Sequence, residues 1–145
     1  MADPINILIA DDHMGVRRAL RALLDSQDGI KVLGEAADGQ EAVRLVRELR
    51  PNVVILDAQM PIMNGIDAAR AIKQMASPPT IIILTMFSMR DLVFKAFEAG
   101  SSAYVLKNSV SEELVEAIQE ALAGRPFLSE RLRHLQGELE ERLGD

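Results

Sequence analysis

The alternation of short apolar runs with longer amphipathic segments is the feature that most limits what this chain can fold into. Five runs are rich in Ile and Val and are too short for helices: 5–10, 31–35, 53–56, 80–84 and 103–106. A segment with apolar residues at helical spacing follows each run, beginning with Val16, Leu20 and Leu24. Strands that are apolar on both faces and alternate with helices predict a doubly wound α/β fold with a five-stranded parallel sheet.

The later helices carry their own start and stop signals. Gly100 is predicted to end the fourth helix. Ser111 is predicted to cap the start of the fifth helix, and Gly124 to end it.

Composition narrows the class of protein. The 145 residues suit one domain, and the absence of cysteine excludes disulfide scaffolds, thiolate catalysis and sulfur-ligated zinc. No signal peptide opens the chain and no apolar run is long enough for a bilayer, so we expect a cytoplasmic protein without a membrane partner. A net charge of −6 opposes direct nucleic-acid binding by this chain.

Polar side chains gather where the predicted strands end. They are Asp11 and Asp12 after the first strand, Asp57 after the third, Thr85 after the fourth and Lys107 after the fifth. Ligands of such sheets bind beyond the carboxyl ends of the strands, so these side chains are expected to converge there. Taken singly, each also has an ordinary interpretation as a helix cap, a loop residue or a solvated surface residue.

Together, the three carboxylates require a cation. Each pair at 4 Å repels by about 4 kcal/mol at an effective dielectric constant near 20. Lys107 supplies one positive charge, and oxygen ligands favour Mg²⁺ for the remainder, held by Asp11 and Asp12. His13 is interpreted as a surface residue at the helix start. A metal beside a carboxylate, a lysine and a hydroxyl suits in-line phosphoryl transfer, with Asp57 as the nucleophile.

Four motifs in this order resemble the receiver domain of bacterial two-component response regulators. They are "ILIADDH", "VVILDAQMPIMNGIDAAR", "IIILTMF" and "AYVLKNS". The segment from "LTMFSMRDLVF" to "ALAGRPFLS" resembles the NarL/FixJ subfamily in particular. The resemblance implies the (βα)5 flavodoxin-like receiver fold, and we assign residues 1–124 to this domain.

The resemblance also implies roles for the site residues. Asp57 would accept a phosphoryl group from a sensor histidine kinase or a small donor such as acetyl phosphate. Asp12 would bind Mg²⁺ directly and Asp11 at least partly through water, with the Gln59 backbone carbonyl and Asp57 as further ligands. Thr85 and Lys107 would contact the phosphoryl group, and Tyr104 would turn inward as Thr85 moves. For Tyr104, a half-buried ring with its hydroxyl in water remains the alternative.

Two positions bear on how the site works. Many receivers have proline after the lysine, whereas this chain has Asn108, so a trans Lys107–Asn108 peptide is expected. Gln59 is large and could slow the approach of water to an acyl phosphate. Arg17, Arg18 and Arg21 stand where receivers generally meet the kinase, with an ordinary solvated face as the alternative.

These residues bear on three functions. The first is a phosphorylation-activated switch that acts on a transcription-regulating output; it would catalyse only its own phosphorylation and dephosphorylation, so it is not classed as an enzyme. The second is a receiver-like interaction module that works without phosphorylation, and the complete acidic and lysine set counts against it. The third, a phosphatase of the haloacid dehalogenase type, would need a second Asp where Gln59 stands.

Residues 125–145 are predicted to form a linker or C-terminal helix, with the output DNA-binding domain absent from this chain. Leu128, Leu132, Leu135 and Leu139 recur at spacings of four, three and four, and Ser129 can cap a helix. The leucine row either packs on its own domain or joins two copies in a homodimer.

Overall fold

Six parallel strands form one sheet in the computed structural model, which describes residues 3–144. The strands are β1 (Ile5–Ala10), β2 (Ile30–Ala36), β3 (Val53–Asp57), β4 (Thr80–Thr85), β5 (Ala103–Leu106) and β6 (Phe127–Leu128). Their order across the sheet is β2-β1-β3-β4-β5-β6, and every neighbouring pair is parallel. The five predicted strands are confirmed, and β6 is an additional edge strand.

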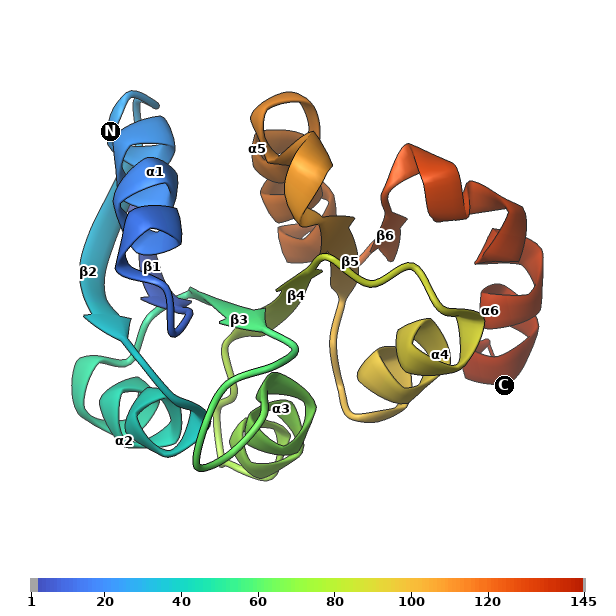
Figure 1. Cartoon of the computed structure of the whole chain (residues 1–145), viewed down its shortest axis with the longest axis horizontal. Helices are drawn as coiled ribbons and strands as arrows, with labels where there is room; N and C mark the ends of the chain where they lie inside the picture. Colours follow the sequence, from blue (N-terminus) through green and yellow to red (C-terminus); the bar gives the residue numbers. More distant parts are fainter. Residues whose placement is uncertain (1–2, 145) are drawn as a thin grey trace.

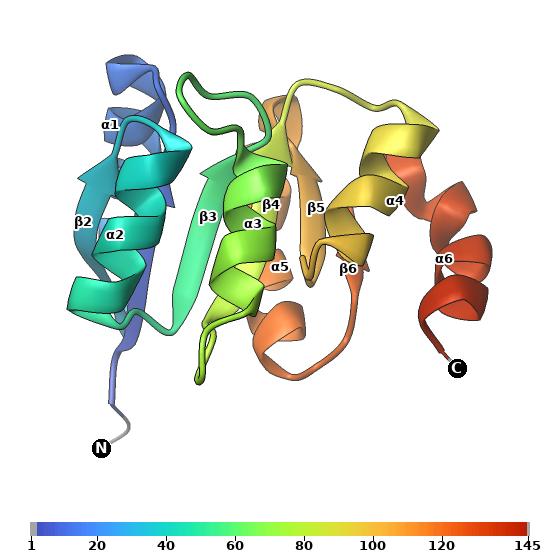
Figure 2. The same cartoon turned by 90° about the horizontal axis from the view of Figure 1, so that it is seen from below.

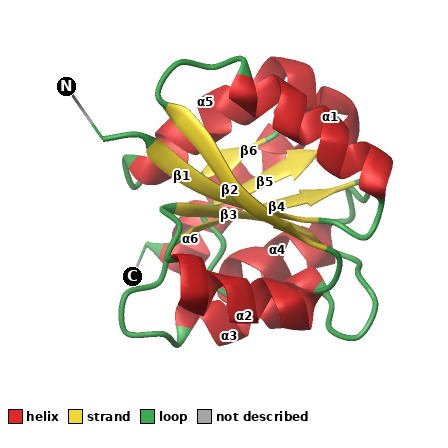
Figure 3. Ribbon diagram, turned by 90° about the vertical axis from the view of Figure 1, so that its left-hand side faces the viewer, coloured by secondary structure: helices red, strands yellow, loops and turns green. Residues whose placement is uncertain are grey.

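Helices cover both faces of this sheet. They are α1 (Met14–Asp25), α2 (Gly39–Leu49), α3 (Gly65–Lys73), α4 (Arg90–Glu98), α5 (Val110–Leu122) and α6 (Gln136–Leu143), with 3₁₀ turns η1 (Lys107–Ser109) and η2 (Glu130–Leu135). Figures 1 and 3 show α1 and α5 on one face and α2, α3 and α4 on the other. This arrangement confirms the doubly wound fold.

Each sheet face has its own apolar cluster. Ile7 and Ile9 of β1 belong to the cluster with α1 and α5, whereas Leu8 and Ala10 belong to the cluster with α2, α3 and α4. Successive side chains of a strand point to opposite faces, so a strand buried on both sides must be apolar throughout. Each fully buried aliphatic side chain contributes about 1.5–3 kcal/mol.

Gly65 allows the chain after β3 to return beside the strand end. A Cβ atom at Gly65 would lie 2.0 Å from the backbone oxygen of Asp57, so any larger residue would displace that strand end. Asn64 is the N-cap residue of α3, and its side chain accepts a hydrogen bond from the Asp67 N–H. The loop therefore supports the position of Asp57.

The predicted start of the fifth helix was wrong. Helix α5 begins at Val110, with Ser109 as its N-cap residue and no side-chain capping bond, and Ser111 lies within the first turn. The 3₁₀ turn η1 continues from Lys107 directly into α5, so helical structure is already established before Ser111. Gly100 and Gly124 have φ values of 112° and 82°, which confirms the two predicted helix ends.

The C-terminal segment, residues 127–143, packs on the edge of the same sheet. Strand β6 pairs with β5, and Figure 2 shows α6 beside α4. The leucines of the predicted row are all buried in the cluster beneath α4: Leu128, Leu132, Leu135 and Leu139. The row thus faces its own domain in this structure, while homodimerisation stays a prediction. Ser129 precedes η2, but its hydroxyl makes no capping bond, because it donates to Glu113 and accepts from the Leu106 N–H instead.

No helix within residues 3–144 combines the length and apolar character needed to cross a membrane.

Candidate functional site

The predicted polar residues lie at the carboxyl ends of the strands. Asp11 follows β1, Asp57 is the last residue of β3, Thr85 is the last residue of β4 and Lys107 follows β5. Asp11, Asp57 and Thr85 are buried, with at most 5% of each residue exposed. The Lys107 ammonium nitrogen lies 2.8 Å from Asp11 Oδ2 and 3.1 Å from Asp57 Oδ2, so one cation bridges two buried carboxylates.

The pKa values of Asp57 and Lys107 are both raised, but for different reasons. Burial raises the pKa of Asp57, and the nearby Asp11 charge adds to the rise, although the Gln59 N–H and Lys107 oppose it. Burial disfavours the charged form of Lys107, but the hydrogen bonds and charges of Asp11 and Asp57 outweigh it and raise the pKa of the lysine. The surroundings of Lys107 therefore favour its charged form, whereas those of Asp57 disfavour its charged form.

The donor set fits a divalent cation. Asp11, Asp12, Asp57 and His13 each offer one ligand atom within 4.8 Å of the others. Asp11 Oδ2 is fully buried, and the Lys107 ammonium group 2.8 Å away is shared with Asp57, so one lysine faces two carboxylates and negative charge remains for a cation to offset. Oxygen atoms predominate, as Mg²⁺ requires.

His13 lies closer to this group than expected. Its side chain is 68% exposed, in agreement with the prediction of a surface residue. However, its Nδ1 atom lies 3.1 Å from Asp12 Oδ1 and 3.3 Å from Asp11 Oδ1, so the imidazole belongs to the rim of the acidic cluster.

A short hydrogen-bonded path connects Thr85 with Tyr104. The Phe87 N–H donates to Thr85 Oγ1 at 3.2 Å, and the Tyr104 hydroxyl donates to the Phe87 backbone oxygen at 2.7 Å. Tyr104 is fully buried, and this burial raises the pKa of its hydroxyl. The alternative with a half-buried ring and its hydroxyl in water is therefore wrong. There is no cis peptide bond between residues 3 and 144, so Lys107–Asn108 is trans as expected.

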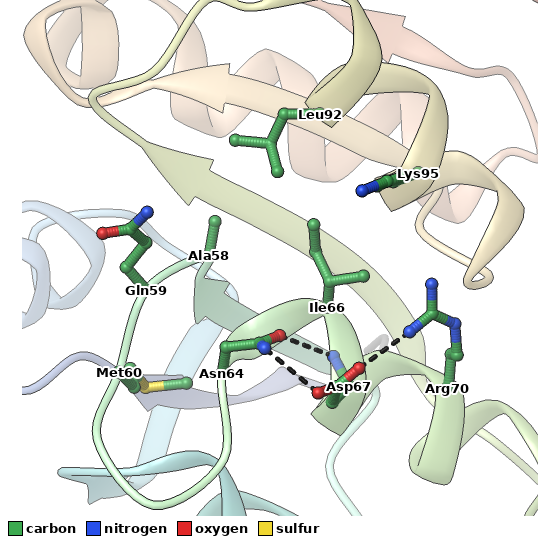
Figure 4. Close-up of a pocket in the computed structure, with 9 residues that line it drawn as sticks. All are labelled: Ala58, Gln59, Met60, Asn64, Ile66, Asp67, Arg70, Leu92 and Lys95. Atoms are coloured by element: carbon green, nitrogen blue, oxygen red, sulfur yellow. Dashed lines mark hydrogen bonds and ion pairs between the residues drawn. The ribbon is translucent and has the colours of Figure 1, made fainter.

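Two hollows meet at the loop after β3. The first is the cleft over the acidic cluster; its lining includes Asp12, Asp57, Met86, Phe87 and Lys107. The second, shown in Figure 4, lies between this loop, α3 and α4. Its one carboxylate, Asp67, is paired with Arg70 at 2.7 Å, so the hollow lacks the crowded carboxylates of the first. The crowded carboxylates therefore line the cleft over Asp57.

Comparison with known families identifies the class of protein. Residues 7–119 match the family model described as the response regulator receiver domain. The chain belongs to this family. Its homologues include response regulators of the LuxR/NarL group, in agreement with the subfamily resemblance in the sequence.

Two curated relatives illustrate how far the receiver extends. The transcriptional regulatory protein LiaR of Bacillus subtilis (strain 168) is 44% identical over 128 residues, which cover 88% of this chain and 61% of LiaR. The nitrate/nitrite response regulator protein NarP of Escherichia coli (strain K12) is 38% identical over 131 residues, covering 90% of this chain and 61% of NarP. The receiver chain thus spans less than two thirds of the length of these relatives.

A solved structure matches nearly the whole receiver chain. It is a two-component response regulator of the LuxR family from Aurantimonas sp. SI85-9A1, with a TM-score of 0.87 and 40% sequence identity. The match covers 99% of this chain and 100% of that structure, so it includes the C-terminal segment.

Proposed function

We propose that this receiver is a phosphorylation-activated switch, in which the Asp57 carboxylate accepts a phosphoryl group from a sensor histidine kinase. The observation that carries the proposal is the bridge from Lys107 Nζ to Asp57 Oδ2 at 3.1 Å, beside Asp11, whose Oδ2 shares the same ammonium group at 2.8 Å. A nucleophilic carboxylate, a fixed positive charge and a cation site are the parts that phosphoryl transfer needs.

In the proposed step, a carboxylate oxygen of Asp57 attacks the phosphorus of a phosphohistidine or of acetyl phosphate. A P–O bond to Asp57 forms while the bond from phosphorus to the imidazole nitrogen, or to the acetate oxygen, breaks. Bound Mg²⁺ would neutralise charge on the transferred oxygens. Asp12 would hold the ion directly and Asp11 partly through water, with Asp57 and the Gln59 carbonyl completing the protein ligands.

The same step would reach Tyr104 through Thr85. The phosphoryl group adds about −1.5 to −2 charges and three acceptor oxygens, which attract the Thr85 hydroxyl and the Lys107 ammonium group. Movement of Thr85 Oγ1 would remove the acceptor of the Phe87 N–H, and Phe87 also holds the Tyr104 hydroxyl. The Tyr104 ring is already buried, so the predicted inward turn does not apply; its hydroxyl would instead leave the Phe87 oxygen, which would change the surface around α4 and β5.

We place the output beyond this domain. Residues 1–124 would be the receiver and residues 125–145 the linker to a DNA-binding domain, because LiaR is a transcriptional regulatory protein of greater length. Phosphorylation would act through that domain or through a homodimer. Apart from adding and removing its own phosphoryl group, the chain would catalyse nothing.

Phosphorylation-independent binding of a partner is the alternative. The intact set of Asp11, Asp12, Asp57, Thr85 and Lys107 counts against it, since a passive binding surface has no need for crowded buried carboxylates.

Intact-mass measurement after incubation with acetyl phosphate tests the proposal. We expect the wild-type chain to gain one phosphoryl group only when Mg²⁺ is present, and Asp57→Asn to gain none. A folded wild-type chain that gains no mass with any donor would contradict the proposal and favour the alternative. A gain that persists in Asp57→Asn would contradict the assignment of Asp57.

A further inference from the structure

We infer that Arg17 is a positioning residue for the metal-binding carboxylates, acting through the backbone of Asp11. The inference rests on the proposed Mg²⁺ site and adds a residue outside its ligand set. Arg17 lies on α1, and its guanidinium reaches back to the turn between β1 and α1. Its role is therefore to fix where the Asp11–Asp12 turn presents its oxygens.

The contacts of Arg17 are directed at two fixed acceptors. Its Nη1 donates to the Asp11 backbone oxygen at 2.6 Å, and its Nε donates to Glu35 Oε1 at 3.0 Å. Only 15% of the side chain is exposed. These contacts show that Arg17 is not an ordinary solvated residue, which was the alternative for this position.

Glu35 holds the guanidinium from the neighbouring strand. It lies on β2, beside Ile9 of β1, and its second oxygen accepts from Arg21 Nε at 2.9 Å. Burial works against the charged form of Glu35, but the hydrogen bonds and charges of Arg21 and Arg17 outweigh it and lower the pKa of this carboxyl. Glu35 thus remains a charged anchor, and α1 is fastened to β2 beside the site.

The peptide groups on both sides of Asp11 are consequently fixed. The Asp11 N–H donates to the Ala36 oxygen at 3.0 Å, while the Asp11 oxygen accepts from Arg17. The side chain is also held, since Asp11 Oδ1 accepts from the His13 N–H at 2.9 Å. The remaining atom, Oδ2, is buried and lies 2.8 Å from the Lys107 ammonium nitrogen, which also pairs with Asp57. The backbone contact from Arg17 therefore helps to aim that oxygen into the site.

The direction in which Mg²⁺ affinity changes on loss of Arg17 distinguishes a positioning role from a simple charge effect. Removal of a positive charge near a cation site favours cation binding by simple electrostatics. Loss of a residue that orients metal ligands instead weakens binding, typically by about 10–100-fold. Arg18 is the matched control, because it is the next residue of the same helix, carries the same charge and is exposed.

The test is isothermal titration of the chain with Mg²⁺. For Arg17→Ala we expect about tenfold weaker Mg²⁺ binding than wild type. We expect Arg18→Ala to stay within about twofold of wild type, and Arg17→Lys, which keeps one donor, to fall between the two alanine variants. Labelling of Arg17→Ala by acetyl phosphate should be slow at low Mg²⁺ and recover at saturating Mg²⁺, since the nucleophile is unchanged.

Thermal unfolding without Mg²⁺ provides the structural control. A lower Tm for Arg17→Ala with an unchanged Mg²⁺ dissociation constant would overturn the inference and leave Arg17 a purely structural residue. Equal Mg²⁺ affinities of Arg17→Lys and wild type, combined with failure of Arg17→Ala to fold, would also overturn it. No Mg²⁺ binding by the wild-type chain would instead contradict the proposed metal site on which the inference rests.

Discussion

Buried carboxylates at two places in this receiver differ in how many hydrogen-bonding or charged partners their oxygens have. Glu113 on α5 accepts from the Ser129 hydroxyl with one oxygen and from the Glu130 N–H, at 2.8 Å, with the other. By contrast, Asp11 and Asp57 share one lysine: the Lys107 ammonium nitrogen lies 2.8 Å from Asp11 Oδ2 and 3.1 Å from Asp57 Oδ2. The first group fastens the C-terminal segment, whereas the second leaves capacity for a ligand.

Hydrogen bonding separates a carboxylate that holds the fold together from one that is available to a ligand. A buried charge is tolerated when its hydrogen bonds are complete, as they are at Glu113. Buried carboxylates that crowd one another and share one lysine are costly: burial first, and then the Asp11 charge, raise the pKa of Asp57. We therefore expect substitutions at the C-terminal segment to weaken the fold and neutralisation at Asp57 to strengthen it.

The largest effect is expected for the apolar anchor of the C-terminal segment. Leu139 of α6 is 1% exposed, so Leu139→Ala should cost about 2–5 kcal/mol of docking free energy. Hydrogen exchange of residues 127–143 should accelerate, because loss of a buried apolar anchor lowers the free energy of local opening of this segment. Leu143→Ala, at a site that is 42% exposed, should change exchange little. Equal exchange in both variants would show that α6 is not held by its leucines.

The second effect concerns Glu113, the buried carboxylate whose two oxygens both accept hydrogen bonds. Glu113→Ala removes the acceptor of Ser129 and of the Glu130 N–H and should cost about 1.5–3 kcal/mol in chemical denaturation. Glu112→Ala changes the same charge at an exposed neighbouring position and should cost far less. If the two variants unfold at the same denaturant concentration, Glu113 contributes nothing beyond its charge.

The third substitution, Asp57→Asn, is expected to stabilise the fold rather than weaken it. A carboxyl whose pKa is raised by folding stabilises the protein below its ordinary pKa and loses that contribution as pH rises through the folded pKa. Without Mg²⁺ at pH 7, Asp57→Asn should therefore raise Tm, by about 2–4 °C per kcal/mol gained. The gain should shrink as pH falls.

Differential scanning calorimetry of Asp57→Asn beside Asp28→Asn measures this difference. Asp28 is exposed, so its neutralisation should move Tm little at any pH. A lower Tm for Asp57→Asn at pH 7 would mean that the Lys107 pairing outweighs burial and crowding at Asp57.

The smallest effect is expected at the surface of the C-terminal segment. The Arg142 guanidinium lies 4.2 Å from the Phe94 ring centre, and it also pairs with Glu98 at 3.6 Å. Arg142→Ala should cost about 0.5–1 kcal/mol, with only its ion-pair part lost at high salt. Arg44→Ala removes an exposed helical ion pair without an aromatic partner and should cost about 0.3–0.5 kcal/mol. Equal costs would assign no stabilisation to the aromatic contact.

The fold and the site residues were predictable where the pattern is local. An apolar run that ends in Asp11 or Asp57 predicts a strand, and it also predicts the sheet edge at which the aspartate lies, because parallel strands align their carboxyl ends. Strand β6 was not predictable, since the two residues Phe127 and Leu128 show no periodicity and pair only because the edge of β5 is present.

Long-range polar contacts were also beyond the sequence. Arg17 binds a backbone oxygen, and any residue could supply that acceptor. Glu113 and Ser129 are 16 positions apart, and only the packing of α5 against β6 brings them together. The hydroxyl of Tyr104 was likewise hard to place, because its acceptor is the backbone of Phe87 in a loop.

We propose that chemistry at Asp57 is sensed at Tyr104, and this chain allows a direct measurement of that coupling. Tyr104 is the only tyrosine, so incorporation of 3-fluorotyrosine gives one protein ¹⁹F resonance. We expect acetyl phosphate with Mg²⁺ to move that resonance as the hydroxyl leaves the Phe87 oxygen, and to leave it unchanged in Asp57→Asn. A resonance that stays in place while intact mass shows full phosphorylation of the wild-type chain would contradict the claim.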